Sequence, residues 1–165
     1  MTDAESRPEP HWLDAEEEQT WVALLTLLMR LPGALDAQLQ RDAGISNFEY
    51  QVLAGLSMSP EHTVRMSVLA ALASGSLPRL SQVVGRLEKR GWVRRTPDPT
   101  DGRYTLAVLT PSGWEKVVET APGHVQEVRR LTIDPLTKAQ SKQLREISLR
   151  IAHAVNPESP ALPRP

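Results

Sequence analysis

The sequence contains no cysteine among its 165 residues, which excludes disulfide bonds, thiolate metal sites and switching by thiol oxidation. Its four histidines are scattered, and no two have the spacing of paired metal ligands, so neither a metal nor another cofactor is expected. A glycine-rich phosphate loop, a nucleophile elbow and paired carboxylates in an apolar setting are also missing. We therefore expect a protein that is not an enzyme.

Membrane and export signals are also absent by inspection of the sequence. No apolar run reaches the length that we expect of a membrane-spanning helix. The N-terminal stretch MTDAESRPEPHWLDAEEE is acidic and polar, the opposite of a signal peptide. Residues 1–11 and 156–165 are rich in proline and charge and are predicted to be disordered. We expect a cytoplasmic protein.

The net charge of −1 conceals an uneven distribution. Residues 1–60 hold three basic against ten acidic side chains, whereas residues 61–110 hold eight basic against four acidic ones. A nucleic-acid-binding protein need not be basic overall if its contact face is basic. The middle of the chain is therefore the candidate contact region.

An amphipathic helix is predicted within this basic region, over residues 76–90. At about 100° per residue, one face carries only apolar side chains and another carries polar side chains within an arc of roughly 80°. The apolar face comprises Leu80, Val83, Val84 and Leu87, and the polar face comprises Arg79, Gln82, Arg86 and Lys89. Gly91 follows as a natural end of the helix. This pattern suits a helix that contacts DNA, and equally a solvated surface helix.

The elements around this helix indicate a winged helix-turn-helix. Ser46 and Glu49 form a capping box that begins one helix, and Ser67 is expected to cap a second, short one. A turn at 73–76 then leads into the helix over 76–90. After it, residues 92–96 and 104–109 are predicted to form a two-stranded ribbon around the turn PDPTDG.

Long apolar helices flank this central part. Asp14 and Glu17 form a capping box before a helix whose apolar side chains cover more than one narrow face. Pro32-Gly33 is expected to kink or split this helix. Thr110 and Thr137 are predicted to cap two further helices. These helices are too apolar for a small monomer to cover, so a homodimer is expected.

The ribbon resembles the MarR family of bacterial transcription regulators, whose pattern is close to RLExRGLVxRxxxPxDxRxxxVxLTxxG. The matches are the RLE and RG around residues 86–91, the paired arginines, Asp101, Arg103, Leu109-Thr110 and Gly113. Trp92, Gly102 and Thr105 depart from the pattern. The order of helices agrees over roughly residues 14–154.

The resemblance implies a mainly α fold with a small β-wing, in a homodimer that binds an inverted repeat in double-stranded DNA. The expected parts are a disordered tail (1–11), a dimerisation helix (12–45), a DNA-binding domain (46–110), two dimerisation helices (111–155) and a second tail (156–165). Repression is the family's commoner mode. A winged helix that binds only other proteins is the alternative function.

Roles in DNA binding can be assigned to individual side chains. The recognition helix is expected to enter the major groove, where arginine suits guanine and glutamine suits adenine. The predicted DNA-binding residues are Ser76, Arg79, Gln82, Arg86, Lys89, Arg95 and Arg103. Arg103 resembles the family arginine that enters the minor groove, and Asp101 is expected to orient either Arg103 or Arg95. Arg94 and Arg95 could equally be solvated strand residues, and Arg65 and His62 are weaker candidates for phosphate contacts.

An effector site is implied by the resemblance, since many family members release DNA on binding small aromatic or hydrophobic compounds. The candidate pocket residues are His11, Trp12, Trp21, Met29 and Trp114. Tryptophans offer flat apolar area and a hydrogen-bond donor, but those on helix seams are more often packing residues.

Overall fold

Six α-helices and a small sheet make up the computed structural model, which describes residues 10–73 and 75–157. The predicted tails lie largely outside these residues. The elements in chain order are α1 (Ala15–Ala43), α2 (Asn47–Ser57), the short helix η1 (Pro60–His62), β1 (Thr63–Arg65), α3 (Met66–Leu72), α4 (Leu77–Lys89), β2 (Val93–Pro97), β3 (Thr105–Leu109), α5 (Pro111–Val128), the π-helical segment η2 (Arg129–Ile133) and α6 (Lys138–Val155). The predicted mainly α fold with a β-wing is confirmed.

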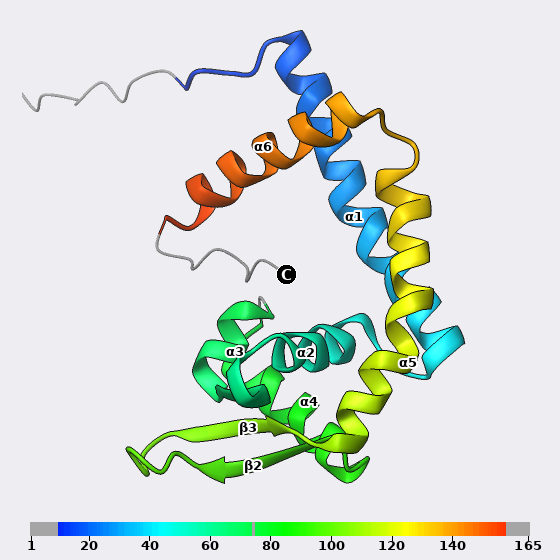
Figure 1. Cartoon of the computed structure of the whole chain (residues 1–165). Coiled ribbons are helices and arrows are strands. Elements are labelled where there is room, and N and C mark those ends of the chain that lie inside the picture. The colour runs from blue at the N-terminus through cyan, green and yellow to red at the C-terminus, as the bar shows by residue number, and fades with distance from the viewer. Residues whose placement is uncertain (1–9, 74, 158–165) are drawn as a thin grey trace, which may run out of the picture.

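Most of the core of the protein lies in residues 45–110, which we call the head, and Leu39 of α1 and Val117 of α5 complete it. Helices α2, α3 and α4 pack against one another and against the sheet (Figure 1). Leucine and valine side chains dominate this core, and the apolar face predicted for α4 is fully part of it. The largest completely buried side chains are Leu39, Ile45, Leu53, Leu56, Leu69, Leu80, Leu87, Val52 and Val84.

The sheet has three antiparallel strands in the order β1-β3-β2, so the predicted two-stranded ribbon is confirmed as β2 and β3, and a third strand, β1, was missed. Strand β1 pairs with β3 through Thr63 opposite Val108, and β2 pairs with the other edge of β3 through Val93 opposite Leu109. A strand of three residues is too short to show an alternating pattern, so its pairing follows from the tertiary fold.

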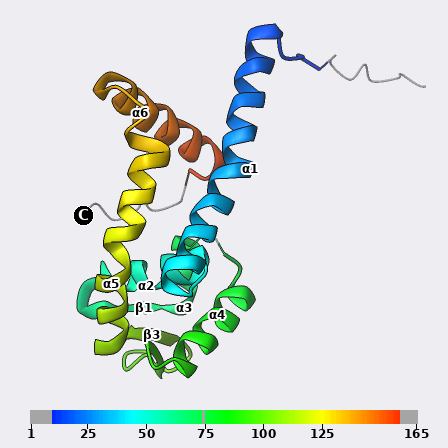
Figure 2. The same ribbon diagram turned by 90° about the vertical axis from the view of Figure 1, so that its right-hand side faces the viewer.

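Helices α1, α5 and α6 form an arm that extends from the head (Figures 1 and 2). Helix α6 lies at the far end of the arm, apart from the head in both views. It buries no residue within the chain, although Leu144, Ile147 and Ile151 lie along one side of it. Large apolar side chains are also exposed on α1, among them Val22, Leu25, Leu28 and Met29. The arm therefore presents apolar surface that the single chain leaves uncovered.

The arm joins the head through polar contacts at the end of α1. Gly44 ends α1 in the left-handed conformation, with φ 65°. The backbone amide of Asn47 donates to Asp36 at 2.7 Å, and Arg90 Nη1 donates to the Gly44 carbonyl at 3.2 Å. Half-buried His124 of α5 packs its ring 4.5 Å from that of Tyr50 on α2, and burial lowers the pKa of His124. The end of α1, the start of α2 and the end of α4 are thus tied together.

Two local expectations about helices need correction. Of the kink or split predicted at Pro32-Gly33, the split is wrong, because Pro32 lies inside α1, which runs for 29 residues in all, and the loss of one backbone donor is tolerated. Ser67 does not cap α3: the N-cap residue is Arg65 and makes no side-chain capping bond, because strand β1 runs directly into the helix. The capping boxes at Asp14, Ser46 and Thr137 are confirmed.

The expectation about membrane-length runs was also wrong. Helix α1 is long and apolar enough to cross a membrane by length and composition. One such helix is weak evidence for insertion, because the core helix of a soluble protein and a signal sequence pass the same test. Arg30 lies within α1, and Gln38 and Leu39 near its end are buried in the protein.

Candidate nucleic-acid interface

Helix α4 presents its polar side chains on the surface of the head. Ser76 caps it, with Oγ accepting the Arg79 amide at 3.4 Å, and Pro78 lies in the first turn. The predicted polar residues Arg79, Gln82, Arg86 and Lys89 are all exposed. The two faces of the helix are therefore as predicted, whereas contact with DNA stays a prediction.

Arg79 is positioned by an aromatic ring that the sequence analysis did not assign to the site. Its guanidinium lies 4.4 Å from the centre of the Phe48 ring, in a cation–π arrangement. Phe48 begins α2 and packs partly against the core. Gly75 leaves room for the ring, since a Cβ there would lie 2.6 Å from Phe48 Cζ. The first turn of α4 thus packs against the start of α2.

Arg86 is held by a buried acid. Its Nε donates to Oε1 of Glu49 at 3.1 Å, and the Glu49 side chain is only 7% exposed. Burial alone would raise the pKa of Glu49, but the Ser46 amide and the guanidiniums of Arg86 and Arg90 outweigh it and hold the pKa below its usual range. Glu49 is therefore ionised at neutral pH, and it orients Arg86 from behind.

Arg95 is held differently, with every nitrogen of its guanidinium engaged. Nε and Nη2 contact Glu88 Oε2 at 2.8 and 2.7 Å, and Nη1 donates to Ser81 at 3.4 Å. Glu88 also accepts the backbone amide of Arg95 at 2.7 Å. This pair ties strand β2 to α4, and it favours a structural role for Arg95 over the predicted DNA contact.

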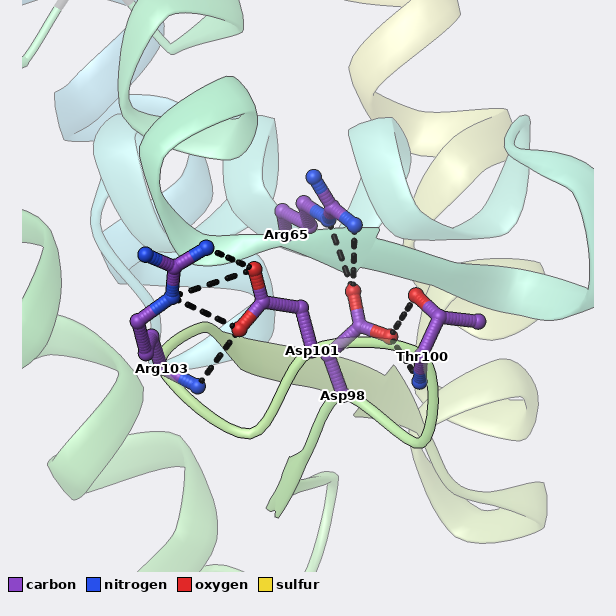
Figure 3. A network of polar contacts seen from close by, with 5 residues as sticks. All are labelled: Arg65, Asp98, Thr100, Asp101 and Arg103. Atoms are coloured by element: carbon purple, nitrogen blue, oxygen red, sulfur yellow. Dashed lines mark hydrogen bonds and ion pairs between the residues drawn. The ribbon is translucent and has the colours of Figure 1, made fainter.

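The wing consists of β2, β3 and residues 98–104 between them, and its tip is organised by Asp101 and Arg103 (Figure 3). Arg103 Nε and Nη2 donate to the two carboxylate oxygens of Asp101 at 2.9 and 2.7 Å. These bonds lower the pKa of Asp101 and raise that of Arg103. The Arg103 side chain is 85% exposed. Of the two partners expected for Asp101, Arg103 and Arg95, the structure shows Arg103.

A second carboxylate, Asp98, organises the start of the loop between β2 and β3 and was missed in the sequence. Its Oδ1 accepts the amide and hydroxyl of Thr100 at 2.9 and 2.7 Å, and its Oδ2 accepts Arg65 Nε at 2.7 Å (Figure 3). Thr100 and Arg65 lower the pKa of Asp98 to about 2. Arg65 also lies 4.5 Å from the centre of the Tyr104 ring. An aspartate followed two residues later by a threonine is a turn signal that could have marked Asp98 in advance.

The candidate effector residues are not gathered in the single chain. Trp12, Trp21 and Met29 are exposed at or along the first helix, Trp12 at 79%. Trp114 lies at the other end of the arm, near the start of α5, with its ring 4.9 Å from that of His62. His11 is exposed beside Trp12. A pocket made of these five residues is therefore not formed within one chain.

A shallow hollow of about 610 Å³ lies instead between η2 and α6. None of the candidate effector residues lines it, and four of its residues are basic. It is lined by Arg129, Ile133, Asp134, Leu136, Lys138, Ser141, Lys142 and Arg145.

Known proteins match this chain over the head and beyond it. The MarR family profile matches residues 43–103. Sco3205, a MarR family transcriptional regulator from Streptomyces coelicolor solved in complex with DNA, is 44% identical with a TM-score of 0.87, over 95% of this chain and 98% of that chain. AbsC, a MarR family regulator from the same organism, is 34% identical with a TM-score of 0.84, over 90% of this chain and 100% of that one.

A third relative is the transcriptional repressor MprA of Escherichia coli (strain K12), which is 26% identical over 66% of this chain. The matches to curated relatives cover 41% and 61% of those relatives' own lengths. The identity to Sco3205 extends over nearly the full length of both proteins. This chain belongs to the MarR family of transcriptional regulators.

Proposed function

We propose that this protein is a repressor that binds an inverted-repeat operator as a homodimer. The observation that carries the proposal is the arrangement of Arg103, which Asp101 holds at the tip of the wing with its side chain 85% exposed, in a head whose helix α4 also exposes its polar residues. In this proposal α4 enters the major groove and the wing reaches the minor groove, where a narrow A·T-rich segment favours arginine. The solved complex of its relative Sco3205 with DNA supports DNA binding by this chain.

The uncovered apolar surface of the arm supports the homodimer. An exposed apolar surface of this extent on a soluble regulator indicates a protein interface. A second copy would cover α1, α5 and α6, and its symmetry would place two copies of α4 about one DNA turn, ~34 Å, apart. The operator would then be an inverted repeat, and a cytoplasmic location would follow from access to DNA.

Repression is proposed because MprA, a transcriptional repressor, is similar over part of the chain. A repressor acts by occupying its operator, so affinity for DNA is the property to measure first. Release by a small aromatic or hydrophobic effector stays a prediction, and it would require a pocket completed by the second copy.

Selection of bound sequences from a random DNA pool, followed by salt-dependent shift assays, tests the proposal. We expect an inverted repeat whose half-sites lie about 10 base pairs apart. Affinity should fall steeply with salt, because phosphate contacts release counterions. A chain that enriches no sequence and shows no salt-sensitive binding would contradict the proposal and would favour a winged helix that binds only other proteins.

A further inference from the structure

Two carboxylates are buried within the described part of the head, those of Glu49 and Asp98, and each holds an arginine. Asp98 holds Arg65, which begins α3 and supports the wing. Glu49 holds Arg86, which belongs to the polar face of α4. Burial of a carboxylate costs desolvation free energy, and Glu49 offsets that cost against an arginine of the candidate recognition helix.

The Glu49 carboxylate is itself fixed by the capping box of α2. Its Oε2 accepts the Ser46 amide at 2.8 Å, and its own amide donates to Ser46 Oγ at 3.1 Å. The other oxygen, Oε1, then points to Arg86 Nε. Because both oxygens are engaged, the carboxylate cannot rotate away from Arg86 without breaking the cap of α2.

Only one edge of the Arg86 guanidinium is used by this contact. Among the described residues, Arg86 makes its hydrogen bond through Nε alone, and its side chain is 54% exposed. Arg95 offers the contrast, since its Nε, Nη1 and Nη2 are all engaged by Glu88 and Ser81. Arg86 therefore keeps the two Nη groups, the pair of parallel donors that can meet guanine O6 and N7 together.

We propose that Glu49 is a positioning residue for sequence recognition, which holds Arg86 so that its Nη groups face one guanine in each half-site. This inference rests on the proposed function. Arginine loses much side-chain freedom when it binds a base in one geometry, and a protein that fixes the side chain beforehand reduces that cost. Glu49 supplies the fixation from α2, while α4 supplies the reading group.

Glu49→Gln is the direct test. Glutamine can still cap the Ser46 amide through its oxygen, but its amide group then faces Arg86 with a donor instead of an acceptor. The full-length protein is measured against the selected operator and against operators changed at each base pair in turn. Discrimination is the ratio of the affinity for the selected operator to that for an operator changed at one base pair. We expect this ratio to fall about two- to tenfold at one symmetric position and to change little at the others.

A second pair of variants keeps the test decisive if Glu49→Gln folds poorly. Arg86→Lys keeps the positive charge but removes the two parallel Nη donors of the guanidinium. The variant protein should therefore discriminate less well at the same base pair. In an Arg86→Ala background, Glu49→Gln should have no further effect on discrimination, because the group that it positions is gone.

Glu88→Gln is the matched control. It makes the same chemical change in an acid of α4, which pairs with an arginine of β2. Because every Arg95 nitrogen is engaged, we expect this variant to leave discrimination between base pairs unchanged, with at most a uniform change in affinity.

Several outcomes would overturn the inference alone: discrimination unchanged in Glu49→Gln, affinity lowered equally for all sequences, or effects of Glu49→Gln and Arg86→Ala that add. Absence of sequence-selective binding by the unmodified protein would overturn the proposed function as well. The two failures are therefore distinguishable.

Discussion

Asp98 and Arg65 tie the loop between β2 and β3 to the edge strand β1, with Nε and Nη2 of Arg65 both 2.7 Å from Asp98 Oδ2. The two residues lie 33 positions apart in the chain, and Asp98 is buried. The wing is thus supported from outside its own hairpin. Arg65, a weak candidate for phosphate contact in the sequence, has its guanidinium engaged in this support.

The acid dependence of stability should change when Asp98 is replaced. The folded-state pKa of Asp98 is about 2, below its ordinary 3.8, so its ionised form stabilises the fold above about pH 4. That stabilisation is lost as the pH falls from about 4 towards 2. We expect Asp98→Asn to be less stable than the unmodified protein at pH 7, with the difference shrinking between pH 4 and pH 2.

Denaturant midpoints measured from pH 7 to pH 2 for both proteins test this expectation. Other acids titrate in both proteins, so the difference isolates Asp98. A difference that stays constant over this range would contradict the assigned role. Asp101→Asn serves as a comparison, because its partner Arg103 is exposed, and we expect a smaller difference there.

Removal of the arginine at the wing tip should weaken DNA binding without unfolding the dimer. Arg103→Ala deletes an 85% exposed side chain, and we expect the loss of about 1–3 kcal/mol of binding free energy. Arg129→Ala is the control, since it removes an arginine paired with Asp134 on the arm. Shift assays on the selected operator give the comparison. Unchanged affinity of Arg103→Ala would refute the wing assignment.

The first turn of α5 has no space for a side chain at Gly113. A Cβ there would collide with the Trp92 carbonyl oxygen and lie 2.8 Å from Leu109 Cδ1. The Trp92 carbonyl is fixed, because it accepts the Thr110 amide at 3.0 Å. We expect Gly113→Ala to lower the free energy of unfolding by about 1–3 kcal/mol.

Gly102→Ala is the matched control for this substitution. Gly102 has open space around the position of a Cβ, and the change should alter stability by no more than about 0.5 kcal/mol. Thermal unfolding followed by circular dichroism measures both variants. Equal effects of the two substitutions would show that the close approach at Gly113 is relieved at little cost.

A charge on the apolar side of α6 should separate the two copies. Ile147 is half exposed on a helix that buries no residue within the chain, so Ile147→Glu should leave the protomer folded. We expect its dimer dissociation constant to rise at least about tenfold, which corresponds to about 1.4 kcal/mol. Sedimentation over a range of concentrations measures this constant.

Met58→Glu places the same charge on an exposed apolar position of the head and should leave the dimer intact. An unmodified protein that is monomeric would contradict the proposed assembly. Flotation of that protein with lipid vesicles would point to a membrane as the occupant of the apolar face of α1 instead.

Features that depend on neighbours in the chain were predictable. The caps at Ser46, Thr110 and Thr137 and the two faces of α4 follow from spacings of three and four residues. The pairing of Asp101 with Arg103 spans two residues and was one of two predicted partners. Family membership confirms the resemblance, and with it the expectation of a transcription regulator and not an enzyme.

Features that depend on tertiary packing were not predictable. Glu49 and Arg86 lie 37 positions apart, and no spacing indicates that they meet. Strand β1 is too short to show a period, and it forms because the free edge of β3 passes beside it. Ser67 has the right chemistry for a cap, but the N-cap position falls two residues earlier, at Arg65, where the strand ends. The sequence thus indicated which side chains of α4 face outward, but not that the buried acid Glu49 holds one of them.

Helix α1 runs without interruption from the far end of the arm into the core of the head, where Leu39 is completely buried. Its 29 residues span roughly 40 Å at about 1.5 Å per residue. Such a helix acts as a stiff lever, so a tilt of about 5° at one end displaces the other by roughly 3–4 Å. A change in the angle between the α1 helices of the two copies would therefore shift the two heads away from the spacing of one DNA turn. No side chain that faces DNA would have to change.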